Sequence, residues 1–385
     1  MLEKALTGSK YYVIWLATLM VLIVVGAMFY LQQLSYGLGL TGMSRDVSWG
    51  LYIAQFTFLV GIAASAVMLV LPYYLHDYKA FGRITILGEF LAVAAIIMCI
   101  TFVIVDLGRP DRVFNVLLHP TPGSILFWDM VVLSGYLLLN IVIGWVVLSA
   151  ERNEVSPPGW VNPLIYLSIP WAVSIHTVTA FLISGMAARG FWNTAIMAPR
   201  FLASAFASGP ALLILFAYAI RRFSGFDAGR QAIQSLATIV TYAMVINLFF
   251  LGCEIFTVFY TQIPDHLNHF LYLYGGMGDG ATLVPFAWFS AITGVLATAL
   301  LIVPSTRDNP KLLGCACALV FLSLWIEKGF TLIIAGFIPN PLETIMEYTP
   351  TFPEIMIVLG VWALGLFVLT LLYKIAITVK QEREL

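Results

Sequence analysis

The sequence predicts an all-α polytopic membrane protein with about ten transmembrane helices. Of its 385 residues, 61% are hydrophobic and only 10% are charged, and the mean hydropathy is +0.95. A water-soluble domain of this length could not carry such a composition without exposing large apolar patches. The apolar residues form long runs without period-two alternation, which favours helices over the strands of a barrel because a helix satisfies its own backbone hydrogen bonds.

Each predicted helix corresponds to one apolar run of about 20 residues or more. The first run is about 24 residues long, which exceeds the core of a signal peptide, so we interpret it as a retained span. The segments between the runs are short, and we expect a single membrane domain over residues 1–385. The ten predicted spans are 11–34, 49–75, 83–105, 124–149, 163–188, 200–221, 232–261, 282–303, 312–338 and 355–379.

The distribution of basic residues predicts which side of the membrane each loop faces. With a cytoplasmic N-terminus, 13 of the 19 lysines and arginines lie on the inner side, Lys4 among them, and Lys328 lies within a span. The other five are assigned to outer loops: Arg45, Arg109, Arg112, Arg189 and Arg200. This pattern obeys the positive-inside rule. We therefore expect a cytoplasmic-membrane protein with both termini inside and the loop from Asp106 to Asp129 outside.

The sequence offers no ligand set for a haem, an iron–sulfur cluster or a metal ion. A haem in a helix bundle needs two facing histidines, and only His176 of the five histidines falls within a predicted span. The four cysteines, Cys99, Cys253, Cys315 and Cys317, form no CxxC pair. A net charge of -1 without a basic patch argues against a nucleic-acid partner and leaves the lipid bilayer as the expected surroundings.

Ionisable residues within or at the edge of spans are functional candidates, because a charge in hydrocarbon is costly. Seven residues meet this criterion: Glu89, Asp106, Asp129, His176, Glu254, Glu327 and Lys328.

Asp129 begins a predicted polar stripe on the fourth span. Tyr136 and Asn140 follow it by seven and eleven residues, which places all three on one helical face. The next span carries His176 about 18 Å from its outer end, with Thr179 one turn further on. Two structural roles stay open: Asp129 would also complement a helix dipole, and His176 would also serve as a packing residue.

The remaining acids are candidates for a proton path. Glu327 and Lys328 are adjacent and are expected to point in different directions, so each would pair with another helix, as structural contacts or as part of a proton path. Glu89 and Glu254 carry the same two interpretations.

Four short motifs resemble the NrfD/PsrC family of quinone-interacting membrane subunits. They are DLGRPDR at 106–112, FWD at 127–129, SIHTV at 174–178 and WIEKGF at 325–330. With ten spans rather than eight, the chain is most similar to the DsrP and Hme-type subunits of sulfate reducers and to the ActC subunit of alternative complex III.

The resemblance implies two four-helix bundles, residues 49–188 with the quinone site and residues 200–338, flanked by the helices at 11–34 and 355–379. It implies a menaquinone or other quinone near the outer face and an extracytoplasmic ferredoxin-like iron–sulfur subunit above it. Asp106 and Asp129 match the ionisable pair assigned to quinone binding and proton exchange. One departure is that ActC-like members have a histidine at the position of Asp106, so the proton acceptor there differs.

We therefore expect the membrane subunit of a respiratory electron-transfer complex that oxidises or reduces a quinone. Asp129 or His176 would accept a quinol proton, and Asp106 would relay protons to the outer water. Arg109 and Arg112 would dock the partner, and the quinone would also contact Arg109, Tyr136, Asn140 and Thr179.

Two alternatives are a subunit that translocates protons or ions and a passive membrane anchor. The expected partners also include a c-type cytochrome and further membrane or cytoplasmic redox subunits, because the chain itself is expected to bind no haem or iron–sulfur cluster.

Overall fold

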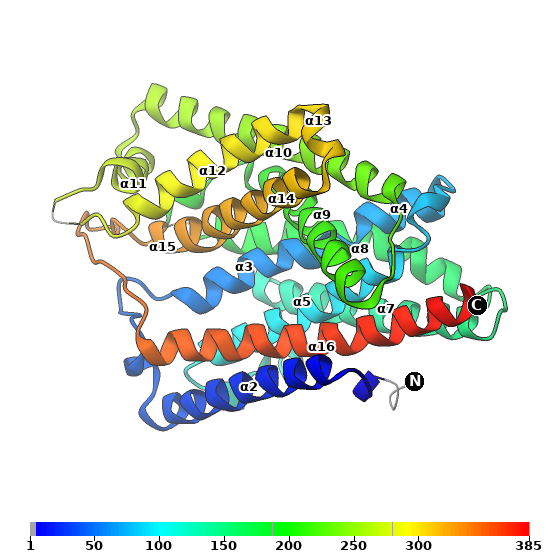
Figure 1. Cartoon of the computed structure of the whole chain (residues 1–385). Helices are drawn as coiled ribbons and strands as arrows, with labels where there is room; N and C mark the ends of the chain where they lie inside the picture. The colour runs from blue at the N-terminus through cyan, green and yellow to red at the C-terminus, as the bar shows by residue number, and fades with distance from the viewer. Residues whose placement is uncertain (1–4, 187, 279, 385) are drawn as a thin grey trace.

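The computed structural model describes residues 5–186, 188–278 and 280–384, so Lys4 lies outside the described part (Figure 1). Within these residues, ten helices are long and apolar enough to cross a membrane, and no strand longer than an isolated bridge is present. The predicted fold class is confirmed. Each of the ten predicted spans coincides with one of these helices.

The first span is α2 (Lys10–Tyr36), and the second is built from α3 (Leu51–Ala64) and α4 (Val67–Leu75). The third, fourth and fifth spans are α5 (Thr85–Asp106), α7 (Ile125–Arg152) and α8 (Val161–Ser184). The next three are α9, α10 and α12, with bounds Met197–Ser224, Arg230–Thr261 and Val284–Ile302. The ninth is built from α14 (Pro310–Leu324), a π-helical segment η5 (Trp325–Thr331) and α15 (Leu332–Ala335), and the tenth is α16 (Phe352–Glu384).

The long helices pack in two groups, which contact each other through α9 and also between α3 and η5. In the first group, α5 contacts α3 and α7, and α7 contacts α8; in the second, α10 contacts α9 and α12, and α14 contacts α12 and α9. α9 also contacts α3 and α8, which joins the groups. The division into bundles at 49–188 and 200–338 stays a prediction.

Both ends of the described chain lie at the same end of the molecule, which we call the terminal end (Figure 1). The opposite end, called the distal end, holds the C-terminus of α5, the short helices η3 (Pro110–Arg112) and α6 (Asn115–Leu118), and α11 (Pro264–Gly275).

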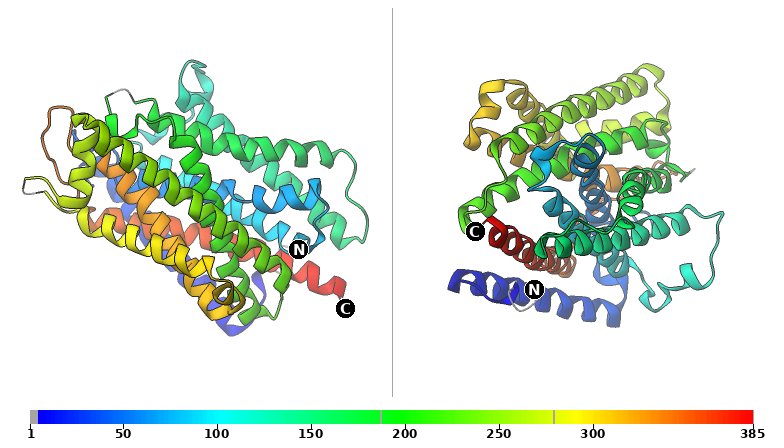
Figure 2. Two further views of the ribbon diagram at one scale, coloured as in Figure 1. Left: turned by 90° about the horizontal axis from the view of Figure 1, so that it is seen from above. Right: turned by 90° about the vertical axis from the view of Figure 1, so that its right-hand side faces the viewer.

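α2 and α16 flank the molecule as an antiparallel pair on the side of α5 (Figure 2). The buried residues of α2 are Leu19, Gly26 and Gln33, which are spaced by seven and form one narrow seam. At its centre, a Cβ added to Gly26 would lie 2.7 Å from the Cα of Gly360. The two backbones therefore touch, as is common where small residues line helix contacts in membranes.

Candidate functional site

α7 presents the predicted polar stripe on its buried face. Asp129, Tyr136 and Asn140 are 3%, 2% and 3% exposed, while the opposite face of α7 carries exposed apolar side chains such as Leu138 and Trp145. The seven- and four-residue spacings place these three groups on one side of a helix. The stripe therefore points into the protein, toward α5 and α8.

Asp129 is held in place from α8. Thr179 is fully buried, and its Oγ1 donates a hydrogen bond of 2.6 Å to Asp129 Oδ1. The buried Cys99 of α5 lies within electrostatic range of the Asp129 carboxylate. Asp129 therefore sits where α5, α7 and α8 meet, and Cys99 lies two turns, about 10 Å, along α5 from Asp106.

Asp106 ends α5 at the distal end. Its Oδ1 is buried and has no hydrogen-bond partner among the described residues. Next to it, Gln33 donates to the Val105 carbonyl at 2.7 Å and accepts from the Tyr52 hydroxyl at 2.7 Å, so α2, α3 and α5 are tied together around the carboxylate. Asp106 also interacts electrostatically with Glu354.

Glu354 is a further candidate residue, near Asp106, that the sequence reasoning missed. It is fully buried at the start of α16 and accepts hydrogen bonds from the backbone N–H of Gly42 at 3.0 Å and from the Tyr348 hydroxyl. Burial and this carboxylate raise the pKa of Tyr348 far above its usual value. A signal was available, because Glu354 precedes the last apolar run much as Asp129 stands near the start of the fourth.

Arg109 and Arg112 lie on the exposed distal loop. Arg109 forms a two-bond contact with Asp111, with Nε and Nη2 each 3.1 Å from a carboxylate oxygen, and its side chain is 67% exposed. Its guanidinium is therefore paired at the surface rather than with Asp106 or Asp129. Both arginines are placed where a partner could reach them.

His176 faces a different neighbour from Thr179. Its Nε2 lies 2.6 Å from the carbonyl oxygen of Phe201 in α9, so Nε2 carries the proton, and its buried Nδ1 has no partner in the described part of the chain. Gly61 of α3 and Lys328 of η5 lie around the same ring. The structure thus separates His176 from Asp129 and places it between the two helix groups.

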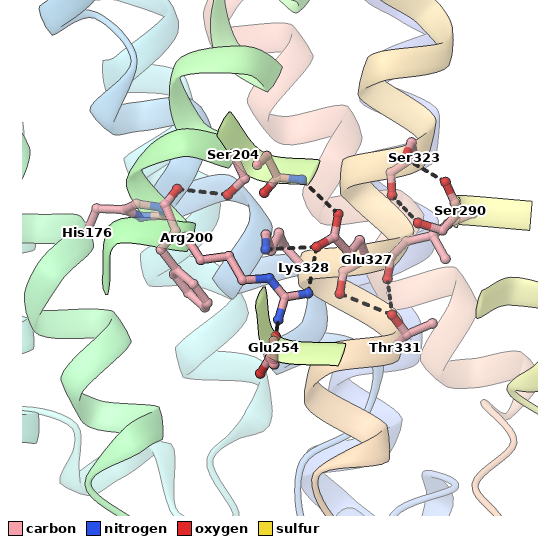
Figure 3. A network of polar contacts seen from close by, with 12 residues as sticks. His176, Arg200, Ser204, Glu254, Ser290, Ser323, Glu327, Lys328 and Thr331 are labelled. Atoms are coloured by element: carbon pink, nitrogen blue, oxygen red, sulfur yellow. Dashed lines mark hydrogen bonds and ion pairs between the residues drawn. The ribbon is translucent and has the colours of Figure 1, made fainter. Parts of the chain in front are cut away.

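A buried network of charges lies beside His176 (Figure 3). Arg200 pairs with Glu254 of α10 and, at 2.8 Å, with Glu327 of η5. Lys328 Nζ contacts the same Glu327 oxygen at 2.9 Å, and Asn247 donates to the other at 3.2 Å. Two cations and two carboxylates therefore compensate one another inside the membrane.

Two predictions about this network were wrong. Arg200 was assigned to an outer loop, but α9 begins at Met197, and the arginine is 5% exposed inside the span. Lys328 was expected to pair with another helix, but its ion pair is with its neighbour Glu327 within the π-helical turn. Among the described residues, it reaches another helix only through the ring of Phe201 in α9, 5.9 Å from its Nζ. Glu327 does reach other helices, as expected.

A small cavity adjoins the network. Its volume is about 30 Å³, and its lining includes Arg200, Asn247, Glu327, Ser290 and Ser323. Arg200 Nε and Asn247 Oδ1 are buried without a partner among the described residues. One is a donor and the other an acceptor, and the space has room for about two water molecules.

Glu89 lies apart from all these groups. It is 3% exposed near the start of α5 and lines a separate cavity at the terminal end. Seventeen residues of helix, about 25 Å, separate it from Asp106. No group of three or more histidine, cysteine, aspartate or glutamate side chains in the described ranges could hold a metal ion.

Comparison with known proteins agrees with this architecture. The family model described as polysulphide reductase, NrfD, matches residues 39–340. A Halobacterium salinarum protein, named as a membrane subunit of a dimethyl sulfoxide reductase, is 27% identical, covering 91% of this chain and 88% of its own length. A selenate reductase subunit of Mesobacillus selenatarsenatis is 25% identical over 86% of each chain.

A third relative is named for a quinone. The Hdr-like menaquinol oxidoreductase integral membrane subunit of Archaeoglobus fulgidus is 25% identical, with 87% of this chain and 86% of its own length covered. These relatives thus match the chain over most of its length. Because the family model also covers most of the chain, this protein belongs to the NrfD family of integral membrane subunits.

Proposed function

We propose that this chain is the membrane subunit of a respiratory complex that exchanges electrons with menaquinone at its distal end. The observation that carries the proposal is the pair of buried carboxylates there, Asp129 fixed by Thr179 and Asp106 with a buried oxygen that no described residue contacts. Support comes from the relatives, of which one is named a menaquinol oxidoreductase subunit and another a menaquinone reductase subunit.

The carboxylates of Asp106 and Asp129 fit a menaquinone, which is the cofactor that the family implies. Oxidation of a bound menaquinol supplies two electrons and two protons, so each hydroxyl needs an acceptor within hydrogen-bond reach. Asp106 Oδ1 is a buried acceptor without a partner among the described residues, which is the kind of atom that a ligand hydroxyl would satisfy. Asp129 offers a second acceptor, with Tyr136 and Asn140 on the same face.

Each residue then has a distinct task. Asp129 accepts one proton, and Thr179 holds its carboxylate in a fixed orientation. Asp106 accepts the other and passes protons to water, because it lies at the last residue of α5 and is only partly buried. We assign no proton from the quinol to His176, since its Nε2 is hydrogen-bonded to the Phe201 carbonyl in α9 and its ring lies between the two helix groups rather than beside Asp129.

The electrons leave through partner subunits. We propose that an extracytoplasmic ferredoxin-like iron–sulfur protein docks on the distal surface near Arg109 and Arg112, with a c-type cytochrome further along. The positive-inside pattern would place this surface outside and both termini in the cytoplasm.

Replacement of Asp129 by Asn tests the site. The variant removes the proton acceptor but keeps its shape, so quinol-dependent reduction of the partner's clusters is expected to be lost while the complex still assembles. Glu343→Gln, which changes an exposed carboxylate in the loop before α16, serves as the matched control. Unchanged turnover in Asp129→Asn would contradict the role of Asp129 as proton acceptor and would favour a passive membrane anchor.

A second candidate function is proton translocation through the second helix group. The favouring observation is the network of Arg200, Glu254, Glu327 and Lys328 beside a cavity with room for about two water molecules. Glu254→Gln and Glu327→Gln are expected to abolish proton pumping in proteoliposomes that contain the complex. Pumping that survives both changes would show that these residues are structural.

A further inference from the structure

A cavity of about 350 Å³ lies at the terminal end, between α4, α5, α7 and α16. Its lining includes Tyr73, Tyr74, Glu89, Glu151 and Lys380. This volume falls within the range of small-molecule sites. Because about 25 Å of α5 separates Glu89 from Asp106, the cavity is distinct from the proposed quinone site.

The lysine in the lining is already engaged. Lys380 Nζ donates to the two carboxylate oxygens of Glu151 at 2.9 and 3.2 Å and to the Gly82 carbonyl at 3.3 Å, which uses all three ammonium hydrogens. Lys380 attracts Glu89 electrostatically but makes no hydrogen bond to it. Lys380 therefore gives no hydrogen bond to Glu89, the innermost carboxylate.

Glu89 is the unsatisfied group. Its side chain is 97% buried, as its exposed fraction is 3%, and its Oε2 has no hydrogen-bond partner among the described residues. A buried acceptor without a donor is costly, by about 1–3 kcal/mol. A ligand that brings a donor to Oε2 would remove this cost.

The rest of the lining selects a cation. Besides the ion pair of Lys380 with Glu151, the lining holds two more carboxylates, Glu89 and Glu154, so an anionic ligand would be repelled. An ammonium group supplies both positive charge and several N–H donors. Tyr73 and Tyr74 also line the cavity, and aromatic rings attract organic cations.

We propose that this cavity binds an organic ammonium group, with Glu89 as its innermost acceptor. The group comes either from the headgroup of an aminophospholipid or from a free amine. The mouth is compatible with both sources, because the lining runs from buried Glu89 to the exposed residues of the α7–α8 loop, Glu154 to Pro157.

The test measures binding to the purified complex and does not use quinol turnover. Ethanolamine is titrated in detergent, and the shift in Tm and the heat of binding are recorded. In parallel, nanodiscs containing phosphatidylethanolamine or phosphatidylglycerol are compared by native mass spectrometry for retained lipid. Ethanolamine binding identifies a free amine as ligand, whereas retention of phosphatidylethanolamine alone identifies the lipid.

Glu89→Gln is expected to weaken binding of the recognised amine at least tenfold, since it removes the acceptor charge but keeps the side-chain shape. Asp77→Asn removes an exposed carboxylate at the same end, outside the cavity, and is expected to leave binding unchanged. Should Glu89→Gln fail to fold, Glu154→Gln at the rim of the cavity provides the second variant. It is expected to weaken binding of the amine severalfold. Absence of amine binding in both arms, or equal affinity in Glu89→Gln or in a folded Glu154→Gln, would overturn the proposal.

Discussion

At the scale of single residues, the buried carboxylates differ in whether their oxygens are satisfied. Glu354 and Glu327 accept several hydrogen bonds from the protein, so their orientation is fixed. Asp106 and Glu89 each keep one buried oxygen without a partner in the described ranges. Unsatisfied buried acceptors are rare in folded proteins, so among the carboxylates these two oxygens mark places where a ligand donor would fit.

Thr179→Val tests whether the orientation of Asp129 matters. The valine keeps the volume but removes the hydrogen bond of 2.6 Å, which is worth about 1.5–3 kcal/mol when a charged partner is involved. We expect quinol oxidation to fall roughly 10- to 100-fold, with the larger effect on kcat. Thr179→Ser keeps the hydroxyl and is expected to restore most of the rate. An equal loss in both variants would indicate a packing role instead.

Arg200→Gln is expected to destabilise the protein by about 3–5 kcal/mol. The change removes the positive charge that Arg200 places beside Glu254 and Glu327, so one buried negative charge is left uncompensated. The double variant Arg200→Gln with Glu254→Gln removes one charge of each sign and is expected to recover much of this loss. Thermal unfolding of the purified complex measures both. A double variant less stable than Arg200→Gln alone would contradict the compensation.

Residue positions were predictable only where one helix decides them. The spacing of Asp129, Tyr136 and Asn140 sets their common face whatever surrounds the helix. The direction of His176 depends on how α8 is rotated against α3 and α9, which is a tertiary property. Arg200 was assigned to the wrong place because it stands at the edge of an apolar run. Hydropathy alone does not decide whether such a residue belongs to the loop or to the span.

At the scale of helices, hydropathy was sufficient for the ten spans but not for their internal irregularities. The second span is interrupted between α3 and α4, and the ninth contains the π-helical turn at Trp325–Thr331. A window of about 20 residues averages over such local features. Wide turns of this kind often lie at functional sites, and this one carries Glu327 and Lys328.

Gly26→Ala tests the contact between α2 and α16. The added Cβ would meet the Gly360 backbone, which cannot move aside as a side chain can, so we expect a cost of about 1–3 kcal/mol and a lower Tm. Gly252→Ala in α10 is the matched control, because nothing lies within 4 Å of its added Cβ. Equal Tm values for the two variants would mean that the seam can open at no cost.

At the scale of the whole molecule, the two ends carry different chemistry. The distal end combines Asp106, Asp129 and Glu354 with an arginine-bearing surface loop, and the terminal end holds the cavity of Glu89. The charge network lies where the two helix groups meet. The protein is therefore arranged with one proposed site in its first helix group at each end of the membrane.

His269 gives the distal end an expected pH dependence. Its Nδ1 donates to the carbonyls of Ala335 and Ile338, both at 2.8 Å, and burial lowers its pKa from the ordinary value of about 6.5. The unfolded chain takes up the proton that makes the His269 ring cationic more readily than the folded chain does. The free energy of unfolding therefore falls as pH drops below about 6.5. We expect Tm to decrease between about pH 7 and about pH 5.

His269→Gln is expected to flatten this decrease, whereas His119→Gln, at an exposed position, is expected to leave it unchanged. An identical slope in His269→Gln and the unmodified protein would assign the acid sensitivity to other groups.

The charge network also constrains how this sequence can diverge. Arg200, Lys328, Glu254 and Glu327 sum to zero, so any single neutral replacement leaves an uncompensated charge in the membrane interior. Replacing one cation and one carboxylate together by neutral residues leaves no uncompensated charge. Across relatives, substitutions at these four positions are therefore expected to occur in opposite-sign pairs, and an alignment of the family would reveal them as covarying sites.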